Sequence, residues 1–278
     1  MMRTPTILSG FLGRNRNVLA GLQAPVAGRH SNGCTRPWFE AAFSRFYADL
    51  YAHRDTAEAE SLLDSLQDLL PARGPVLDLA CGAGRLLGPL GRRFGEVVGL
   101  DLSRDLLAVA RERAGSARLV RSDMRTPPFA AGSFAAVFSF FTSFGYFENP
   151  ADDEAVVARV AHCLQPGGKY VLDFLNAGPV TSELVPKSEQ TIGDRRVESS
   201  RSFDVASRVI RKTVRVFRED ALEVTYEERV RAYTPDELDA IFARSGLEVV
   251  HRYGGYAKEP FERDRSLRYV LVGRRMSS

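Results

Sequence analysis

Three acidic residues lie in or just beyond short apolar segments that the sequence predicts to be successive parallel strands. They are Asp78, Asp101 and Asp123. Parallel strands end at a common edge of a sheet, so these side chains are expected to share one crevice there. One carboxylate can accept hydrogen bonds from a ribose diol, and another can accept from the exocyclic amine of adenine. The set therefore favours a nucleoside with a positive charge over a polyphosphate.

A glycine-rich turn follows the first of these segments, in the run VLDLACGAGR over residues 76–85. Glycines at such a turn let the backbone approach a ligand closely, because no Cβ stands in the way. The GxGxxG fingerprint of dinucleotide sites requires a third glycine, and Leu87 stands at that position. Asp78 would also place a carboxylate next to a phosphate. Both features argue against a nicotinamide oxidoreductase.

Four segments, in order and correctly spaced, resemble motifs of the class I S-adenosylmethionine-dependent methyltransferases. They are DLACGAGR (78–85), GLDLS (99–103), SDMR (122–125) and LQPGG (164–168). The resemblance runs from about residue 47 to 176 and again from 233 to 274. It implies a Rossmann-like α/β fold, S-adenosyl-L-methionine as cofactor, and an in-line methyl displacement for which the protein mainly supplies orientation.

The resemblance also implies roles for individual residues at the cofactor site. Asp101 would hold the ribose hydroxyls, Asp123 and Met124 would flank adenine, and the first turn would face the methionine moiety. The full implied set is Tyr47, Asp78, Ala80, Cys81, Gly82, Gly84, Asp101, Leu102, Asp123, Met124 and Phe140. Ala80 replaces the first loop glycine of the family, which adds one methyl group. The alternatives are a packing role for the glycines, a helix cap for Asp101 and a turn for Asp123.

The methyl acceptor is expected to face the aromatic segment Phe140–Phe147. Relatives that methylate exocyclic amines of nucleic-acid bases usually carry an acid or asparagine, two prolines and an aromatic residue here, and this chain does not. Its SFGY form (143–146) resembles small-molecule N-methyltransferases, including those acting on amino sugars and glycine. Tyr146 would hold the acceptor through its hydroxyl or its ring. His251, as a base, is the second catalytic candidate, and no histidine shows metal-ligand spacing.

The elements that must position these residues alternate along the chain. Strands are predicted over 76–80, 96–100, 117–121, 134–140 and 169–174. Helices are predicted over 38–51, 56–70, 85–94, 104–114 and 152–164. This alternation predicts a parallel sheet covered by helices on both faces. Residues 177–195 are predicted to be a loop, followed by β segments at 196–205, 209–217 and 222–231. A helix from Thr234 and a hairpin of strands 247–253 and 267–272 would complete seven strands, with an antiparallel insertion over about 180–232.

Composition sets the limits for these interpretations. The chain has 278 residues, 44% hydrophobic and 26% charged, as in a soluble globular protein. No apolar run approaches the roughly 18 residues that cross a bilayer, so no membrane partner is expected. Three cysteines without a CxxC pair predict reduced thiols and a cytoplasmic location. Five arginines and no acid lie in residues 1–39, so the body is nearly neutral and a nucleic-acid partner is not expected.

The sequence therefore predicts a flexible basic extension (1–36) and a methyltransferase domain (37–278) that methylates N or O of a small metabolite. One alternative is a tRNA or protein methyltransferase that docks its substrate on the basic tail and the arginine-rich insertion. Another is a cofactor-binding module without catalysis. The arginines of the insertion fit an acidic substrate, a homodimer surface, or a solvated sheet face paired with glutamates.

Overall fold

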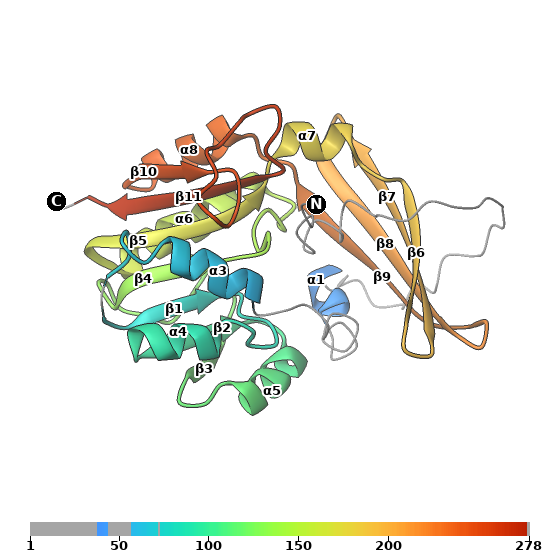
Figure 1. The fold of residues 1–278 in the computed structure, drawn as a ribbon, viewed down its shortest axis with the longest axis horizontal. Coiled ribbons are helices and arrows are strands. Elements are labelled where there is room, and N and C mark those ends of the chain that lie inside the picture. Colours follow the sequence, from blue (N-terminus) through green and yellow to red (C-terminus); the bar gives the residue numbers. More distant parts are fainter. Residues whose placement is uncertain (1–37, 44–56, 72, 277–278) are drawn as a thin grey trace.

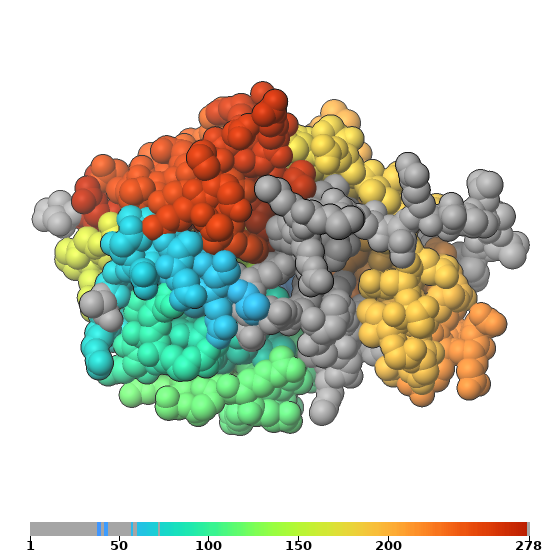
Figure 2. Space-filling view, in the orientation of Figure 1, coloured from blue at the N-terminus to red at the C-terminus, as the bar shows by residue number. Residues whose placement is uncertain are grey.

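The structure, a computed structural model, describes residues 38–43, 57–71 and 73–276. These residues form two β-sheets, and the short helix α1 (Trp38–Ala42) lies between them (Figure 1). The smaller sheet projects from one end of the body that the larger sheet and its helices form (Figure 2). Tyr47 and the predicted basic extension lie outside the described residues. None of the described helices is long and apolar enough to cross a bilayer.

Within the described chain, the larger sheet has seven strands in the order β10-β11-β5-β4-β1-β2-β3. Its strands are β1 (Val76–Leu79), β2 (Val97–Asp101), β3 (Arg118–Arg121), β4 (Phe134–Ser139), β5 (Leu164–Leu175), β10 (Leu247–Tyr253) and β11 (Arg268–Arg275). Neighbours from β5 to β3 are parallel, whereas β11 and β10 form an antiparallel hairpin beside β5. This confirms the predicted mostly parallel sheet. Since β1 lies between β2 and β4, its carboxyl end is the switch point at which such sheets bind ligands.

Helices cover both faces of this sheet. One face is covered by α3 (Ala57–Ser65), α4 (Leu87–Phe94) and α5 (Arg104–Arg113). The other is covered by α6 (Pro150–Cys163), α7 (Ala177–Ser182) and α8 (Pro235–Arg244). Strand β1 shows why: Val76 packs with the first group, and Leu77 and Leu79 pack with the second. Every residue of β1 is buried, as expected for a parallel strand between two layers.

Two helix starts agree with capping signals in the sequence. Ser103 accepts a hydrogen bond from the Leu106 amide (3.2 Å) at the start of α5. Thr234 and Glu237 form a reciprocal capping box at the start of α8. Because each cap is local, it fixes where its own helix begins. The Ser103 cap places the start of α5 directly after Asp101, the acid that ends β2.

As far as the structure describes the chain, the smaller sheet has four antiparallel strands in the order β6-β7-β8-β9. They are β6 (Lys187–Ile192), β7 (Arg195–Asp204), β8 (Val209–Arg218) and β9 (Ala221–Arg231). The prediction of a loop over 177–195 is therefore wrong, since α7 and β6 lie there. Strand β6 (KSEQTI) is a polar strand at the edge of the sheet, held there by backbone pairing with β7. Its sequence lacks the alternation of apolar and polar residues from which a strand is predicted.

Alternate residues of β8 point to the two faces of the smaller sheet. Ile210, Val214 and Val216 are buried. On the opposite face, arginines pair with acids of neighbouring strands, including Arg211 with Glu227 (3.4 Å). Arg218 likewise lies 2.9 Å from Glu223 of β9, whereas Arg208, which precedes β8, pairs with Glu237 of α8 (2.6 Å).

Candidate functional site

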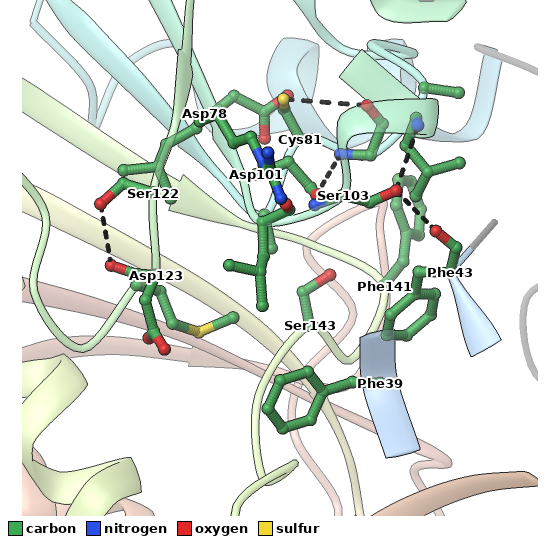
Figure 3. A pocket seen from close by; sticks show the side chains of 18 of the residues that line it. Phe39, Phe43, Asp78, Cys81, Asp101, Ser103, Ser122, Asp123, Phe141 and Ser143 are labelled. Atoms are coloured by element: carbon green, nitrogen blue, oxygen red, sulfur yellow. Dashed lines mark hydrogen bonds between the residues drawn. The ribbon is translucent and has the colours of Figure 1, made fainter. Parts of the chain in front are cut away.

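A cavity of about 390 Å³ opens at the carboxyl ends of β1, β2, β3 and β4 (Figure 3). The strand register explains why these ends are level, because Leu79 lies beside Leu100 and Asp101 lies beside Arg121. The predicted cofactor residues that line the cavity are Asp78, Ala80, Cys81, Gly82, Asp101, Leu102, Asp123, Met124 and Phe140. The acids and the glycine turn thus share one cleft, as the sequence predicts.

Asp101 lies between the first turn and the start of α5. Its Oδ2 accepts from the Gly82 amide (2.8 Å) and its Oδ1 accepts from the Ser103 amide (2.8 Å). Since Ser103 caps α5, Asp101 is not the N-cap. Burial raises the pKa of Asp101, and the amide hydrogen bonds oppose that shift. Each carboxylate oxygen uses one acceptor site on the backbone and keeps another for a ligand.

Asp78 is the most deeply buried acid of the cavity, with 3% of its surface exposed. Among the described residues, its Oδ2 has no hydrogen-bond partner. Burial, and then the charge of Asp101, raise the pKa of Asp78 to about 8. A buried carboxylate oxygen without a donor is unfavourable unless a ligand supplies one. The geometry therefore fits a ligand that brings a cationic donor to this end of the cavity.

The first turn is built from left-handed residues. Ala80, Gly82 and Gly84 have φ of 60°, 54° and 76°. A Cβ on Gly84 would lie 2.9 Å from the Cβ of Ala110. Gly84 therefore lets the turn pack against α5, and it is not among the residues that line the cavity. Ala80 does line the cavity, in a conformation that glycine adopts more easily.

Asp123 lines the cavity, but its carboxylate is already engaged. Both oxygens accept from the Arg125 side chain (Nε 3.1 Å to each oxygen, Nη2 2.7 Å to Oδ2), and Oδ1 also accepts from the Arg125 amide (2.8 Å). Burial raises the pKa of Asp123, yet the bonds from Arg125 outweigh it and the net shift is downward. The predicted contact with an adenine amine would have to share this carboxylate with Arg125.

The aromatic segment after β4 forms the opposite wall. Phe140, Phe141, Ser143, Tyr146 and Phe147 line the cavity. Phe144 is 1% exposed and belongs to the core, so this aromatic of the segment does not face the cavity.

Helix α1 completes this wall. The Trp38 ring lies 5.4 Å from the Tyr146 ring, and Trp38 Nε1 donates to the Tyr146 carbonyl (3.2 Å). Phe39 and Phe43 also line the cavity, and Ser103 Oγ donates to the Phe43 carbonyl (2.6 Å). Phe39 of this helix and Phe43, directly after it, therefore form part of the cavity wall.

His251 is elsewhere. It lies on β10 at one edge of the sheet, where β11, β5 and β4 separate it from β1. Its ring stacks on Tyr253 at 5.9 Å, and it is not among the described residues that line the cavity. This position does not suit a base for chemistry in the cleft. Three or more metal-ligating side chains do not cluster anywhere in the described parts of the chain.

Comparison with known proteins agrees with this geometry. A family model described as a methyltransferase domain matches residues 76–168. A dTDP-3-amino-3,4,6-trideoxy-alpha-D-glucopyranose N,N-dimethyltransferase of Streptomyces venezuelae is 31% identical over 206 residues, or 72% of this chain and 86% of that protein. The chain belongs to the S-adenosylmethionine-dependent methyltransferases.

Two further relatives extend the similarity over most of this methyltransferase. A dTDP-3-amino-3,6-dideoxy-alpha-D-glucopyranose N,N-dimethyltransferase of Streptomyces fradiae is 31% identical over 81% of this chain and 92% of that protein. The S-adenosylmethionine-bound structure of CalS10, an amino pentose methyltransferase from Micromonospora echinaspora, superposes with a TM-score of 0.63. It is 26% identical, covering 89% of this chain and all of that one. The predicted family, fold and cofactor are therefore confirmed.

The residues of the cleft fit S-adenosylmethionine. The unpartnered Oδ2 of Asp78 would take its ammonium group, and the remaining acceptor sites of Asp101 would take its ribose hydroxyls. When bound, the cofactor supplies an electrophilic methyl group on a sulfonium. Burial raises the pKa of the Cys81 thiol, so this cavity residue is neutral and not a nucleophile.

Sequence reasoning missed a polar network behind the aromatic wall of this methyltransferase. Asp173 on β5 is fully buried and pairs with Arg268 at the start of β11. A signal was available, because Asp173 is a lone charge inside the apolar run YVLDFL (170–175). Its partner could not be identified, since Arg268 lies 95 residues further along the chain.

Proposed function

We propose that this methyltransferase acts on the amino nitrogen of a small deoxysugar carried on a nucleoside diphosphate. The observation that carries the proposal is the similarity to the S. venezuelae amino-sugar N,N-dimethyltransferase, which spans 86% of that protein and so includes more than the cofactor half. The S. fradiae relative is also described as acting on a dTDP-linked 3-amino sugar.

The aromatic wall supports an amine acceptor. Methylation of nitrogen creates positive charge on it, and aromatic ring faces attract cations. Tyr146 presents a ring and a hydroxyl from the wall that Phe39, Phe43 and Phe147 complete. These side chains would keep water away from the reacting nitrogen and hold its lone pair in line with the methyl group.

The acids of the cavity do not form an evident base for this amine. Asp101 accepts from two backbone amides, and Asp123 is paired with Arg125. Asp78 would be paired with the cofactor ammonium, and no histidine lines the described part of the cavity. We infer that the amine reacts in its neutral form and that its proton leaves to solvent. The pH dependence of the methyl transfer rate should then follow the pKa of the acceptor amine.

The test is incubation of the protein with S-adenosylmethionine and dTDP-3-amino-3,6-dideoxy-alpha-D-glucopyranose. Mass spectrometry should show addition of one and then two methyl groups, and NMR should place them on nitrogen. The matched control is the sugar nucleotide with a hydroxyl in place of the amine, which should remain unchanged. Methylation of the control, or labelling of RNA or protein in cell extract instead of the amine, would overturn the proposal.

A further inference from the structure

A buried polar cluster supports the wall of the cavity from behind. Asp173 and Arg268 are 0% and 2% exposed, and Arg268 Nη1 donates to Asp173 Oδ1. The other oxygen, Oδ2, accepts from the Tyr256 hydroxyl (2.8 Å) and from the Phe141 amide (2.7 Å). Two of these donors come from the hairpin region of β10 and β11, and the third comes from the turn after β4.

The turn that this carboxylate holds is strained. Phe141 and Thr142 are consecutive non-glycine residues with φ of 63° each. A left-handed conformation is unfavourable for an L-residue other than glycine, and it persists where the surroundings impose it. Asp173 supplies both restraints: its side chain accepts from the Phe141 amide, and its carbonyl accepts from the Thr142 amide (3.1 Å).

The strained turn determines which side chains reach the cavity. Phe140, Phe141 and Ser143 line the cleft from this turn, and the labelled Phe141 and Ser143 are visible in Figure 3. The Cζ of Arg85, a residue of the first turn, lies 3.5 Å from the centroid of the Phe141 ring. The conformation at Phe141 is therefore linked to the turn that surrounds the methionine end.

The far end of the same segment is fixed separately. The Gly145 carbonyl accepts from the Arg231 amide (2.8 Å), and the Glu148 carbonyl accepts from Arg231 Nη2 (3.0 Å). Arg231 of β9 thus holds the C-terminal end of the segment, and its N-terminal end is held at Phe141 and Thr142. That is the point at which Asp173 acts.

We propose that Asp173, with Arg268 and Tyr256, is a positioning residue for methyl transfer, because it holds the Phe141–Thr142 turn in the conformation that presents Ser143 and Tyr146 to the acceptor. The charge is not needed for the sheet itself, since Val171 on the same face of β5 and Val270, its register partner on β11, are apolar and fully buried. A buried ion pair is often no more stabilising than well-packed apolar residues, whereas a lone buried charge is costly. The pair is thus explained by the turn it holds. The test by kcat for the amino sugar rests on the proposed function, whereas the test by hydrogen exchange at the turn does not.

The decisive variant replaces both charges by apolar residues, Asp173→Leu with Arg268→Met. The expected result is a melting temperature lowered by the loss of the acceptor for the Tyr256 hydroxyl and the Phe141 amide, and an S-adenosylhomocysteine Kd near that of the wild type. The kcat for the dTDP-3-amino-3,6-dideoxy sugar should fall about 10–100-fold. Hydrogen exchange at the amides of 141–147 should accelerate. A stable double variant with wild-type kcat and wild-type exchange would overturn the proposal, because the pair would then serve the fold alone.

A milder pair of variants covers the case in which the double variant does not fold. Tyr256→Phe removes one donor to Asp173, and Tyr269→Phe removes a comparable hydroxyl that donates to Asp239 (2.6 Å) away from the turn. Tyr256→Phe should lower kcat about 3–10-fold and speed exchange at 141–147, while Tyr269→Phe should do neither. Equal effects of the two would overturn the proposal. If the wild type does not turn over the amino sugar, the proposed function fails, and the exchange comparison still tests the role of Asp173.

Discussion

The buried carboxylate of Asp78 makes cofactor affinity depend on pH in a way that Asp78→Asn should abolish. In the free protein its Oδ2 has no partner among the described residues, and its pKa is raised to about 8. Below that pH the group is mostly protonated. A ligand ammonium pairs with the carboxylate, so binding at neutral pH must release a proton.

The size of the effect follows from that pKa of about 8. The ionised fraction of Asp78 rises roughly fifteenfold between pH 6.5 and pH 8, and the affinity for S-adenosylhomocysteine should rise by the same factor. Asp78→Asn should show no such rise. At pH 8 it should bind about 10–150-fold more weakly, because a hydrogen bond to a charged group contributes roughly 1.5–3 kcal/mol.

Isothermal titration calorimetry measures both quantities. Titrations at pH 7 in two buffers of different ionisation enthalpy should show close to one proton released by the wild type and none by Asp78→Asn. Equal proton release by the two proteins, or a wild-type affinity that falls as pH rises, would refute the assignment of the ammonium to Asp78.

The same pKa predicts an opposite effect on stability. The folded-state pKa of about 8 lies above the ordinary value of 3.8, so the unfolded chain ionises first and the free protein loses stability as pH rises from about 4 to 8. At pH 7 the penalty is at most about 4 kcal/mol. Asp78→Asn should therefore melt at a higher temperature than the wild type without ligand, and ligand should stabilise it less.

Three further outcomes test the remaining assignments. Ala80→Gly should raise the free energy of unfolding by about 0.5–1 kcal/mol in urea titrations, since φ of 60° is strained for alanine; a loss of stability would contradict this. Asp101→Ala should weaken S-adenosylhomocysteine binding at least tenfold in calorimetry, because it removes the acceptor that joins the first turn to α5, and an unchanged Kd would count against a ribose contact. His251→Ala should change kcat/KM less than twofold, and a tenfold loss would show that β10 takes part in the reaction.

The cofactor half could be predicted from the sequence because its signals are local. The turn after β1, the acid that ends β2 and the cap Ser103 lie within 28 residues of one another, and each element is specified by its own residues. Parallel pairing then brings their ends together without further information. Gly84 was expected at the turn, and the structure adds that its role there is contact with Ala110.

The rest depended on contacts between distant segments. His251 was a candidate from its place in a late strand near glycines, and only the strand order shows that β10 is at the far edge. The engagement of Asp123 follows from a side-chain rotamer of Arg125, which sequence patterns do not specify. Asp173 and Arg268 meet only because β11 inserts beside β5.

The place of Trp38 has a practical consequence. It is the one tryptophan of the chain, and its indole lies edge-on to Tyr146 in the wall of the cavity while α1 packs on β9. Intrinsic emission excited in the indole band therefore originates from a single site next to the cavity. The protein carries its own fluorophore for stopped-flow measurement of acceptor entry and product release, without any label.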